Sequence, residues 1–91
     1  INQRDDEFMS SKPSDEELMV MYQNGIEEGF AKLYDRYQGR VYGYVKARVR
    51  SDEKARDIFQ EIFIKLHRTK ANYKATFPFQ SWIFTISHSV I

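Results

Sequence analysis

Four residues in the middle of the chain have types and spacing that suit binding to another protein. The spacing of Asp57, Gln60, Glu61 and Ile64 places all four on one side of a predicted helix. The opposite side is apolar and is formed by Ala55, Ile58, Phe59, Ile62 and Leu66. A solvated face explains the polar residues but not the isoleucine, whereas a partner helix explains all four. Exposed single isoleucines also occur, so the pattern alone leaves an interface and a solvated face equally open.

A second group combines aromatic and basic residues over a short stretch without an apolar period. It contains Lys70, Tyr73, Lys74, Phe77, Phe79 and Trp82. Proteins that bind single-stranded nucleic acid use such rings to stack on bases and such lysines to neutralise phosphates. Aromatic residues beside a loop are also common plugs of a hydrophobic core, and we expect at least Phe79 and Trp82 to be partly buried.

No combination of residues favours catalysis or metal binding. His67 and His88 lack the spacing of a zinc motif, the chain has no cysteine, and its glycines do not form a phosphate-binding loop. Asp57 and Glu61 lie one helical turn apart, but an outward-facing pair lacks the buried surroundings that acid–base catalysis needs. His67 is better explained as a cation in the last turn of its helix. We therefore predict a binding protein that is not an enzyme and needs no metal or cofactor.

Composition and charge indicate one small globular domain with an uneven charge distribution. The 91 residues are 42% hydrophobic and 30% charged, and no apolar run approaches the ~18 residues that span a bilayer. We therefore predict no membrane insertion, and the absence of cysteine permits a reducing compartment such as the cytoplasm. Residues 1–28 have a net charge of −6 and residues 29–91 a net charge of +7. A basic body favours a polyanionic partner, although solvated helix faces also gather lysine and arginine.

Hydrophobic periodicity predicts an all-α fold. The predicted helices cover residues 15–24, 27–50, 53–68 and 79–91, with a loop over 69–78. The last helix has no capping residue before the sequence ends, so we expect it to belong to a longer helix. These elements predict a compact bundle of three long helices and one short N-terminal helix.

Local signals add detail to this bundle. Residues 1–13 are acidic and aperiodic and predict a disordered leader outside a domain that covers 14–91. Ser14 and Glu17 form a predicted capping box at the first helix. The predicted seam of the second helix is Phe30, Tyr34, Tyr37, Val41, Tyr44 and Arg48. Gly39 and Gly43, four residues apart, predict a close helix crossing or a kink.

Several segments of the chain together resemble a known family. In order, they are DEELM, GFAKLYDRYQGRVYGYV, ARDIFQEIFIKLH and FPFQSWIFTIS. They resemble the second conserved domain of bacterial sigma factors, most closely the small extracytoplasmic-function (ECF) group. The similarity is strongest over residues 55–66, which are similar to the family pattern A-[ED]-D-[LIV]-x-Q-[ED]-[VI]-F-[LI]-[KR]-[LV].

This resemblance implies a domain of a transcription initiation factor that docks on core RNA polymerase and melts the promoter. In the family, the residues matching Asp57, Gln60, Glu61 and Ile64 bind the clamp coiled coil of the largest polymerase subunit. The loop and the following helix bind the minus-ten element as single-stranded DNA. On this chain, the implied DNA-binding residues are Lys70, Tyr73, Lys74, Phe77, Gln80 and Ser81.

The chain departs from the family pattern at a few positions. Ser87-His88-Ser89 stands where Ala-Arg-Asn is common, His67 where Trp is frequent, and Ile26 where an acidic cap is usual. An alternative function is a sigma-like helical adaptor that binds polymerase or an anti-sigma protein without reading DNA. An anti-sigma factor is also a potential partner under the first hypothesis.

Overall fold

The computed structural model describes residues 12–91, which form four α-helices and one 3₁₀ turn without any strand in that range. In chain order the elements are α2 (Asp15–Gln23), α3 (Glu27–Lys46), α4 (Asp52–Thr69), η2 (Lys70–Asn72) and α5 (Phe79–Val90). The predicted all-α fold of three longer helices and a short first one is confirmed. The second helix ends at Lys46 instead of Arg50, and most of the predicted leader, residues 1–11, lies outside the described residues.

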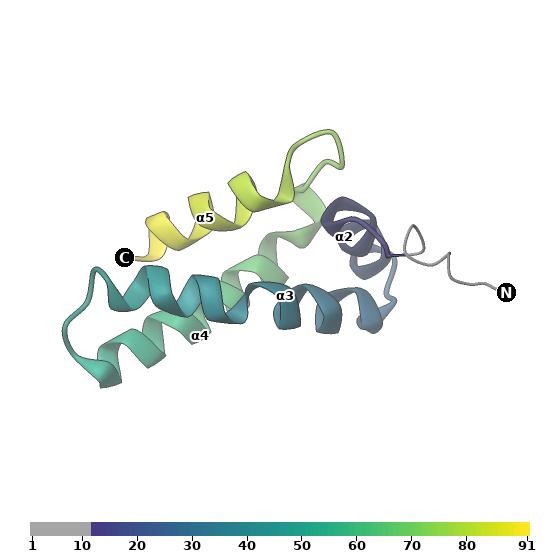
Figure 1. The fold of residues 1–91 in the computed structure, drawn as a ribbon. Helices are drawn as coiled ribbons and strands as arrows, with labels where there is room; N and C mark the ends of the chain where they lie inside the picture. The colour runs from purple at the N-terminus through teal and green to yellow at the C-terminus, as the bar shows by residue number, and fades with distance from the viewer. Residues whose placement is uncertain (1–11) are drawn as a thin grey trace, which may run out of the picture.

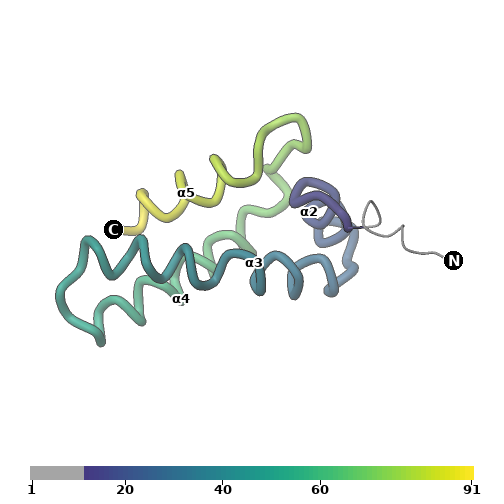
Figure 2. Tube along the Cα trace, viewed as in Figure 1, coloured from purple at the N-terminus to yellow at the C-terminus, as the bar shows by residue number. Residues whose placement is uncertain are grey.

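The three longer helices pack along one another, and α2 covers one end of the assembly. α3 and α4 form an antiparallel pair, and α5 returns along α3 after the loop (Figure 1). α2 contacts the first part of α3 and lies beside η2 and the start of α5 (Figure 2). Within residues 12–91, no helix has both the length and the apolar character needed to cross a membrane.

Side-chain caps start two of the four helices. The Ser14 hydroxyl accepts a hydrogen bond from Glu17 N at 3.0 Å, and the Glu17 carboxylate accepts one from Ser14 N at 2.8 Å. This reciprocal pair confirms the predicted capping box. The Ser51 hydroxyl accepts a bond from Lys54 N at 3.2 Å and begins α4 in the same way.

One row of α3 residues forms its buried face, and it differs from the predicted heptad seam. The buried row is Gly29, Leu33, Tyr37, Val41 and Val45. Four of the predicted seam residues, Phe30, Tyr34, Tyr44 and Arg48, are only half-buried or exposed. A row with a constant spacing of four inclines to the helix axis, so it suits partner helices that cross α3 at an angle. The other helices contribute further buried side chains to the same hydrophobic core: Leu18, Met19, Ala55, Ile62, Phe79 and Ile83.

Gly29 provides the close helix contact in this fold. A Cβ atom at Gly29 would lie 2.4 Å from the Leu18 carbonyl oxygen, so α2 and α3 touch through their backbones. Gly39 and Gly43 are exposed and have no atom within 4 Å of such a Cβ. The prediction of a close crossing at Gly39 and Gly43 was therefore wrong, because within residues 12–91 neither glycine is in close contact with another helix.

Candidate functional site

The outer side of α4 carries the residues that were predicted to bind a protein partner. We call Asp57, Gln60, Glu61 and Ile64 the α4 stripe. Three of them are exposed, and Glu61 is half-buried, with 3.1 Å between its Oε2 and Arg68 Nη2. Ile64 is 49% exposed. The structure thus gathers the four residues on one surface with an uncovered apolar side chain at its end.

An apolar groove, the α2/α4 groove, opens beside the α4 stripe and was missed in the sequence. It has a volume of about 750 Å³, and Ile64 forms part of its wall. Its rings are Tyr22, Phe30 and Phe63, with Tyr22 and Phe30 5.1 Å apart between centroids. The signal in the sequence was weak, because these rings come from three different helices and each also fits an ordinary core position.

His67 and Lys70 lie at the edge of this groove and both contact Tyr22. The Tyr22 hydroxyl and His67 Nδ1 form a hydrogen bond, and Lys70 Nζ lies 4.5 Å from the Tyr22 ring centroid. Burial, and secondarily the charge of Glu27, raise the pKa of the Tyr22 hydroxyl. Lys70 therefore has a packing role besides its charge. Across residues 12–91, no group of three or more His, Asp or Glu side chains could hold a metal ion.

Tyr73 corrects the predicted set of DNA-binding residues. Its ring is only 4% exposed and packs against Trp82 and Phe79, with centroid distances of 5.0 and 6.1 Å. Its hydroxyl donates a hydrogen bond to the Phe77 carbonyl, and burial raises its pKa. This buried position does not fit the DNA-binding role predicted for Tyr73, because its ring packs in the hydrophobic core below the loop and is not open to a base.

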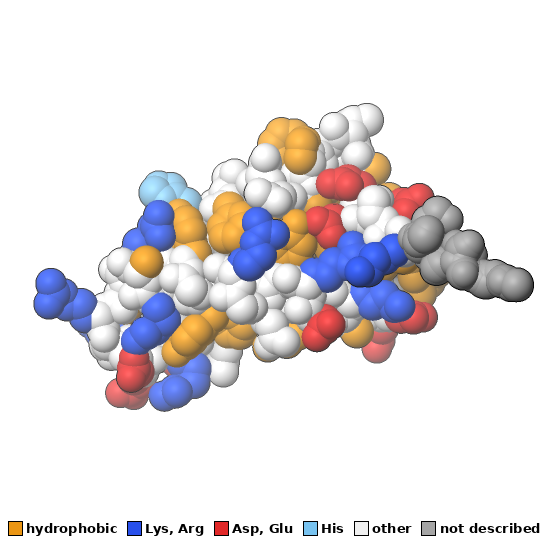
Figure 3. Space-filling view, in the orientation of Figure 1, with side chains coloured by type: hydrophobic (Ala, Val, Ile, Leu, Met, Phe, Trp, Pro, Cys, Tyr) orange, Lys and Arg blue, Asp and Glu red, His pale blue; other side chains and the backbone are white. Residues whose placement is uncertain are grey.

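The other predicted loop residues lie at the surface. We call Lys74, Phe77, Gln80 and Ser81 the loop surface; all four are exposed, and Phe77 is 49% exposed despite its apolar ring. A pocket of about 260 Å³, the loop pocket, lies between Phe77 and Trp82 and is floored by Tyr73. Figure 3 shows a hydrophobic group standing out at the top of the molecule among side chains of other kinds. The loop pocket is smaller than the ~300–1,000 Å³ of drug-sized ligand sites, so it suits one planar group.

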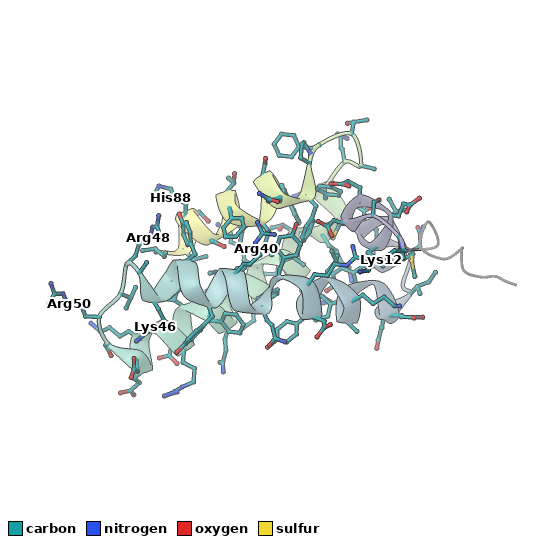
Figure 4. The ribbon with its side chains drawn as sticks, viewed as in Figure 1. Lys12, Arg40, Lys46, Arg48, Arg50 and His88 are labelled. Atoms are coloured by element: carbon teal, nitrogen blue, oxygen red, sulfur yellow. The ribbon has the colours of Figure 1, made fainter. Side chains whose placement is uncertain are left out.

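Basic residues of α3 form a further surface that the sequence analysis did not assign. Arg36, Arg40 and Tyr44 of α3 and Arg48 in the turn just after it follow one another at intervals of four and form what we call the α3 ridge. Arg40 lies over the rings of Tyr37 and Phe84, with 4.9 and 5.6 Å to their centroids. Arg48 lies 3.7 Å from the Tyr44 centroid. Figure 4 shows Arg40 and Arg48 on the side of α3 that faces α5.

Comparison with known proteins shows the family to which this chain belongs. The family model described as Sigma-70 region 2 matches residues 33–91, which include α4, the loop and α5. The chain belongs to the Sigma-70 region 2 family. The resemblance noted in the sequence is thereby confirmed, and the match covers the α4 stripe and the loop surface of this sigma region 2 domain.

Curated relatives of this sigma region 2 domain have the names of sigma factors. The domain is 29% identical over 79 residues to "RNA polymerase sigma-H factor" of Pseudomonas aeruginosa and 32% identical over 79 residues to "ECF RNA polymerase sigma-E factor" of Escherichia coli K12. Each alignment covers 87% of this chain and 41% of the relative. The chain thus spans less than half the length of these relatives.

A solved structure has the same fold. It is an NMR structure of the complex formed by an engineered region 2 of sigmaE with GTAAAA. The TM-score is 0.81 at 29% identity, and the alignment covers 90% of this chain and 85% of the other. The similarity confirms the predicted helical bundle as the fold of sigma factor region 2.

Proposed function

We propose that this domain belongs to a transcription initiation factor, docks on core RNA polymerase and binds the minus-ten promoter element as single-stranded DNA. The observation that carries the proposal is the similarity to a region 2 in complex with GTAAAA, together with an open loop pocket on this chain. The proposed domain covers residues 14–91 and acts in the cytoplasm by binding, without catalytic activity. Core polymerase and promoter DNA are its proposed partners, and an anti-sigma factor is a further one.

The loop pocket suits an unstacked base. Phe77 offers a half-exposed ring on one side, and Trp82 forms another wall. Stacking of a base on an aromatic ring contributes ~1–3 kcal/mol, which is comparable to the few kcal/mol needed to move a base out of the duplex stack. Gln80 and Ser81 lie in the first turn of α5 and supply polar groups for base edges.

Positive charge in the loop and on the side of α3 that faces α5 suits the DNA backbone. Lys74 is exposed in the loop, and the exposed Arg40 and Arg48 of the α3 ridge lie on the side that faces α5. Each phosphate that such a side chain neutralises adds about 0.7 to the salt dependence of single-strand binding. Binding should therefore weaken as salt rises.

The α4 stripe suits a protein partner. Gln60 and Ile64 are exposed and contribute little to the core, so their side chains are free to contact another helix. Ile64 also lines the α2/α4 groove, which extends the apolar area next to the stripe. An apolar area beside polar residues is the usual anatomy of a protein interface. We assign this surface to the clamp coiled coil of polymerase.

Phe77 and Ile64 form a matched pair for testing the two surfaces, because both are apolar and 49% exposed. Phe77→Ala should weaken binding of single-stranded GTAAAA by ~1–3 kcal/mol and leave co-purification with core polymerase unchanged. Ile64→Glu should abolish co-purification and leave oligonucleotide binding unchanged. If both variants lost both activities, or if Phe77→Ala bound DNA normally, the assignment of the surfaces would be wrong.

The adaptor alternative has one specific observation in its favour. The α2/α4 groove is large and apolar and suits a protein segment. An adaptor would bind polymerase or an anti-sigma protein but not an oligonucleotide. Failure of the wild-type domain to bind single-stranded GTAAAA at low salt would favour this alternative.

A further inference from the structure

Helix α5 lacks a cap from its own sequence neighbours. Its N-cap position is Pro78, which forms no side-chain cap, so the first amides of α5 need another acceptor. Glu16 of α2 supplies one: its Oε2 accepts a hydrogen bond from Phe79 N at 2.8 Å across 63 positions of the chain. A carboxylate at a helix N-terminus also interacts favourably with the helix dipole. α2 thus caps the helix that begins just after the loop.

The opposite end of α2 holds the other end of the loop. Gln23 Nε2 donates hydrogen bonds to the carbonyl oxygens of Lys70 and Tyr73 at 2.8 and 2.7 Å. Glu16 and Gln23 are seven residues apart, which is about two helical turns, so they lie on the same face of α2. This face therefore bonds to the chain just before and just after residues 74–78.

Residues 74–78 have mainly local contacts of their own. The Phe77 amide donates to the Lys74 carbonyl at 2.9 Å, and the Tyr73 hydroxyl donates to the Phe77 carbonyl. All five residues are exposed. The position of the loop relative to the bundle is consequently set by its two ends, where Glu16 and Gln23 bind.

α2 is itself fixed firmly enough to serve as a reference. Leu18 and Met19 are fully buried, and Gly29 brings the α3 backbone against the Leu18 carbonyl. Asp15 adds an ion pair to Arg36 with 2.8 Å between Oδ1 and Nη1, and its Oδ2 accepts a bond of 2.5 Å from the Tyr37 hydroxyl. These contacts tie α2 to α3 independently of the loop.

We propose that Glu16 and Gln23, here called the α2 anchor, are positioning residues that hold Phe77 and the loop pocket in the geometry that accepts a base. The proposal rests on the proposed DNA-binding function and extends it to a helix that lies outside residues 33–91, the part matched by the family model. The α2 anchor acts through the loop and is not assigned a DNA contact.

The test uses the full chain and the fluorescence of Trp82, which is the single tryptophan and lines the loop pocket. Single-stranded GTAAAA is titrated into wild type, Glu16→Ala, Gln23→Glu and Gln23→Ala. Gln23→Glu keeps the shape of the side chain but replaces its two donors with an acceptor that faces two carbonyls. We expect Kd to rise about fivefold in Glu16→Ala, which corresponds to the loss of one cap of about 1 kcal/mol, and at least as much in the Gln23 variants, which lose two hydrogen bonds.

Matched variants separate positioning from charge and from helix stability. Glu17→Ala breaks the capping box of the same helix without touching the loop, and it should bind like wild type. Glu16→Gln retains an acceptor for Phe79 N and should recover most of the affinity that Glu16→Ala loses. Gln38→Glu adds one exposed carboxylate on α3, so it measures the effect of the charge that Gln23→Glu also adds.

A second readout keeps the proposal testable without DNA. Acrylamide should quench Trp82 more strongly in Glu16→Ala and Gln23→Glu than in wild type and Glu17→Ala, because a displaced loop uncovers the ring. Wild-type quenching and wild-type affinity in folded anchor variants would overturn the proposal. If the wild type itself fails to bind GTAAAA, the proposed function fails, and the quenching result alone then decides whether α2 holds the loop.

Discussion

A glycine series in α3 tests the contact that seats α2 on the bundle. A Cβ at Gly29 would lie 2.4 Å from Leu18 O and 3.0 Å from Tyr22 N, which are backbone atoms that cannot rotate away. Relieving this overlap requires a shift of α2, and such overpacking costs about 1–3 kcal/mol. Alanine gains about 1 kcal/mol of helix propensity over glycine. A clash with backbone atoms belongs at the upper end of this range, about 3 kcal/mol. Subtracting the gain of about 1 kcal/mol in helix propensity, we expect Gly29→Ala to destabilise the domain by about 2 kcal/mol.

Gly39→Ala and Gly43→Ala are matched controls in the same helix. Glycine-to-alanine changes at these positions meet open space, because no contacting atom lies within 4 Å of an added Cβ. Each should therefore stabilise the domain through the higher helix propensity of alanine, by about 0.5–1 kcal/mol. Thermal unfolding followed by far-ultraviolet circular dichroism measures all three, with about 4–8 °C expected per kcal/mol for a domain of this size. Gly29→Ala should lower Tm and the controls should raise it. A rise of Tm in Gly29→Ala would refute the α2–α3 contact and, with it, the α2 anchor.

Three further predictions concern the α4 stripe, the core and the loop. Gln60→Ala combined with Ile64→Glu should abolish co-purification with core polymerase and change Tm by only a few degrees; unfolding would show that the stripe belongs to the core. Burial, followed by the hydrogen bond to a carboxylate, raises the pKa of Tyr37 from 10.0 to about 12. The stability that the neutral Tyr37 contributes is therefore complete below pH ~10 and is lost as pH rises through ~12. Between these pH values, urea unfolding should show a smaller loss of stability for Tyr37→Phe than for wild type. Equal losses in the two proteins would contradict this. Lys74→Gln should reduce the salt slope of GTAAAA binding by about 0.7, and an unchanged slope would remove this lysine from the DNA contact.

Local patterns predicted the elements and the surface position of the α4 stripe. The capping box at Ser14 and Glu17 involves neighbours in sequence, so its residue types were sufficient to locate the start of α2. The α4 stripe followed from the 3.6-residue period, because Ile64 falls on the polar side of an otherwise regular apolar pattern. Neither prediction required knowledge of how the helices pack.

Contacts between distant segments could not be predicted in this way. Residue type does not distinguish Gly29 from Gly39, since only the position of α2 makes one of them essential for close packing. Tyr73 has the ring of a stacking residue, yet this ring is buried against Phe79 and Trp82. The bond from Phe79 N to Glu16 spans 63 positions and leaves no local pattern. These misses all depend on tertiary packing.

The central claim is that this sigma region 2 domain binds single-stranded minus-ten DNA. The most direct measurement is a titration of the full chain with single-stranded GTAAAA and with a longer duplex that contains this sequence, followed by Trp82 fluorescence at several salt concentrations. The account predicts saturable binding of the single strand, weaker binding of the duplex, and affinity that falls linearly with salt on logarithmic axes. Equal affinity for both forms, or no binding of the single strand at low salt, would contradict it.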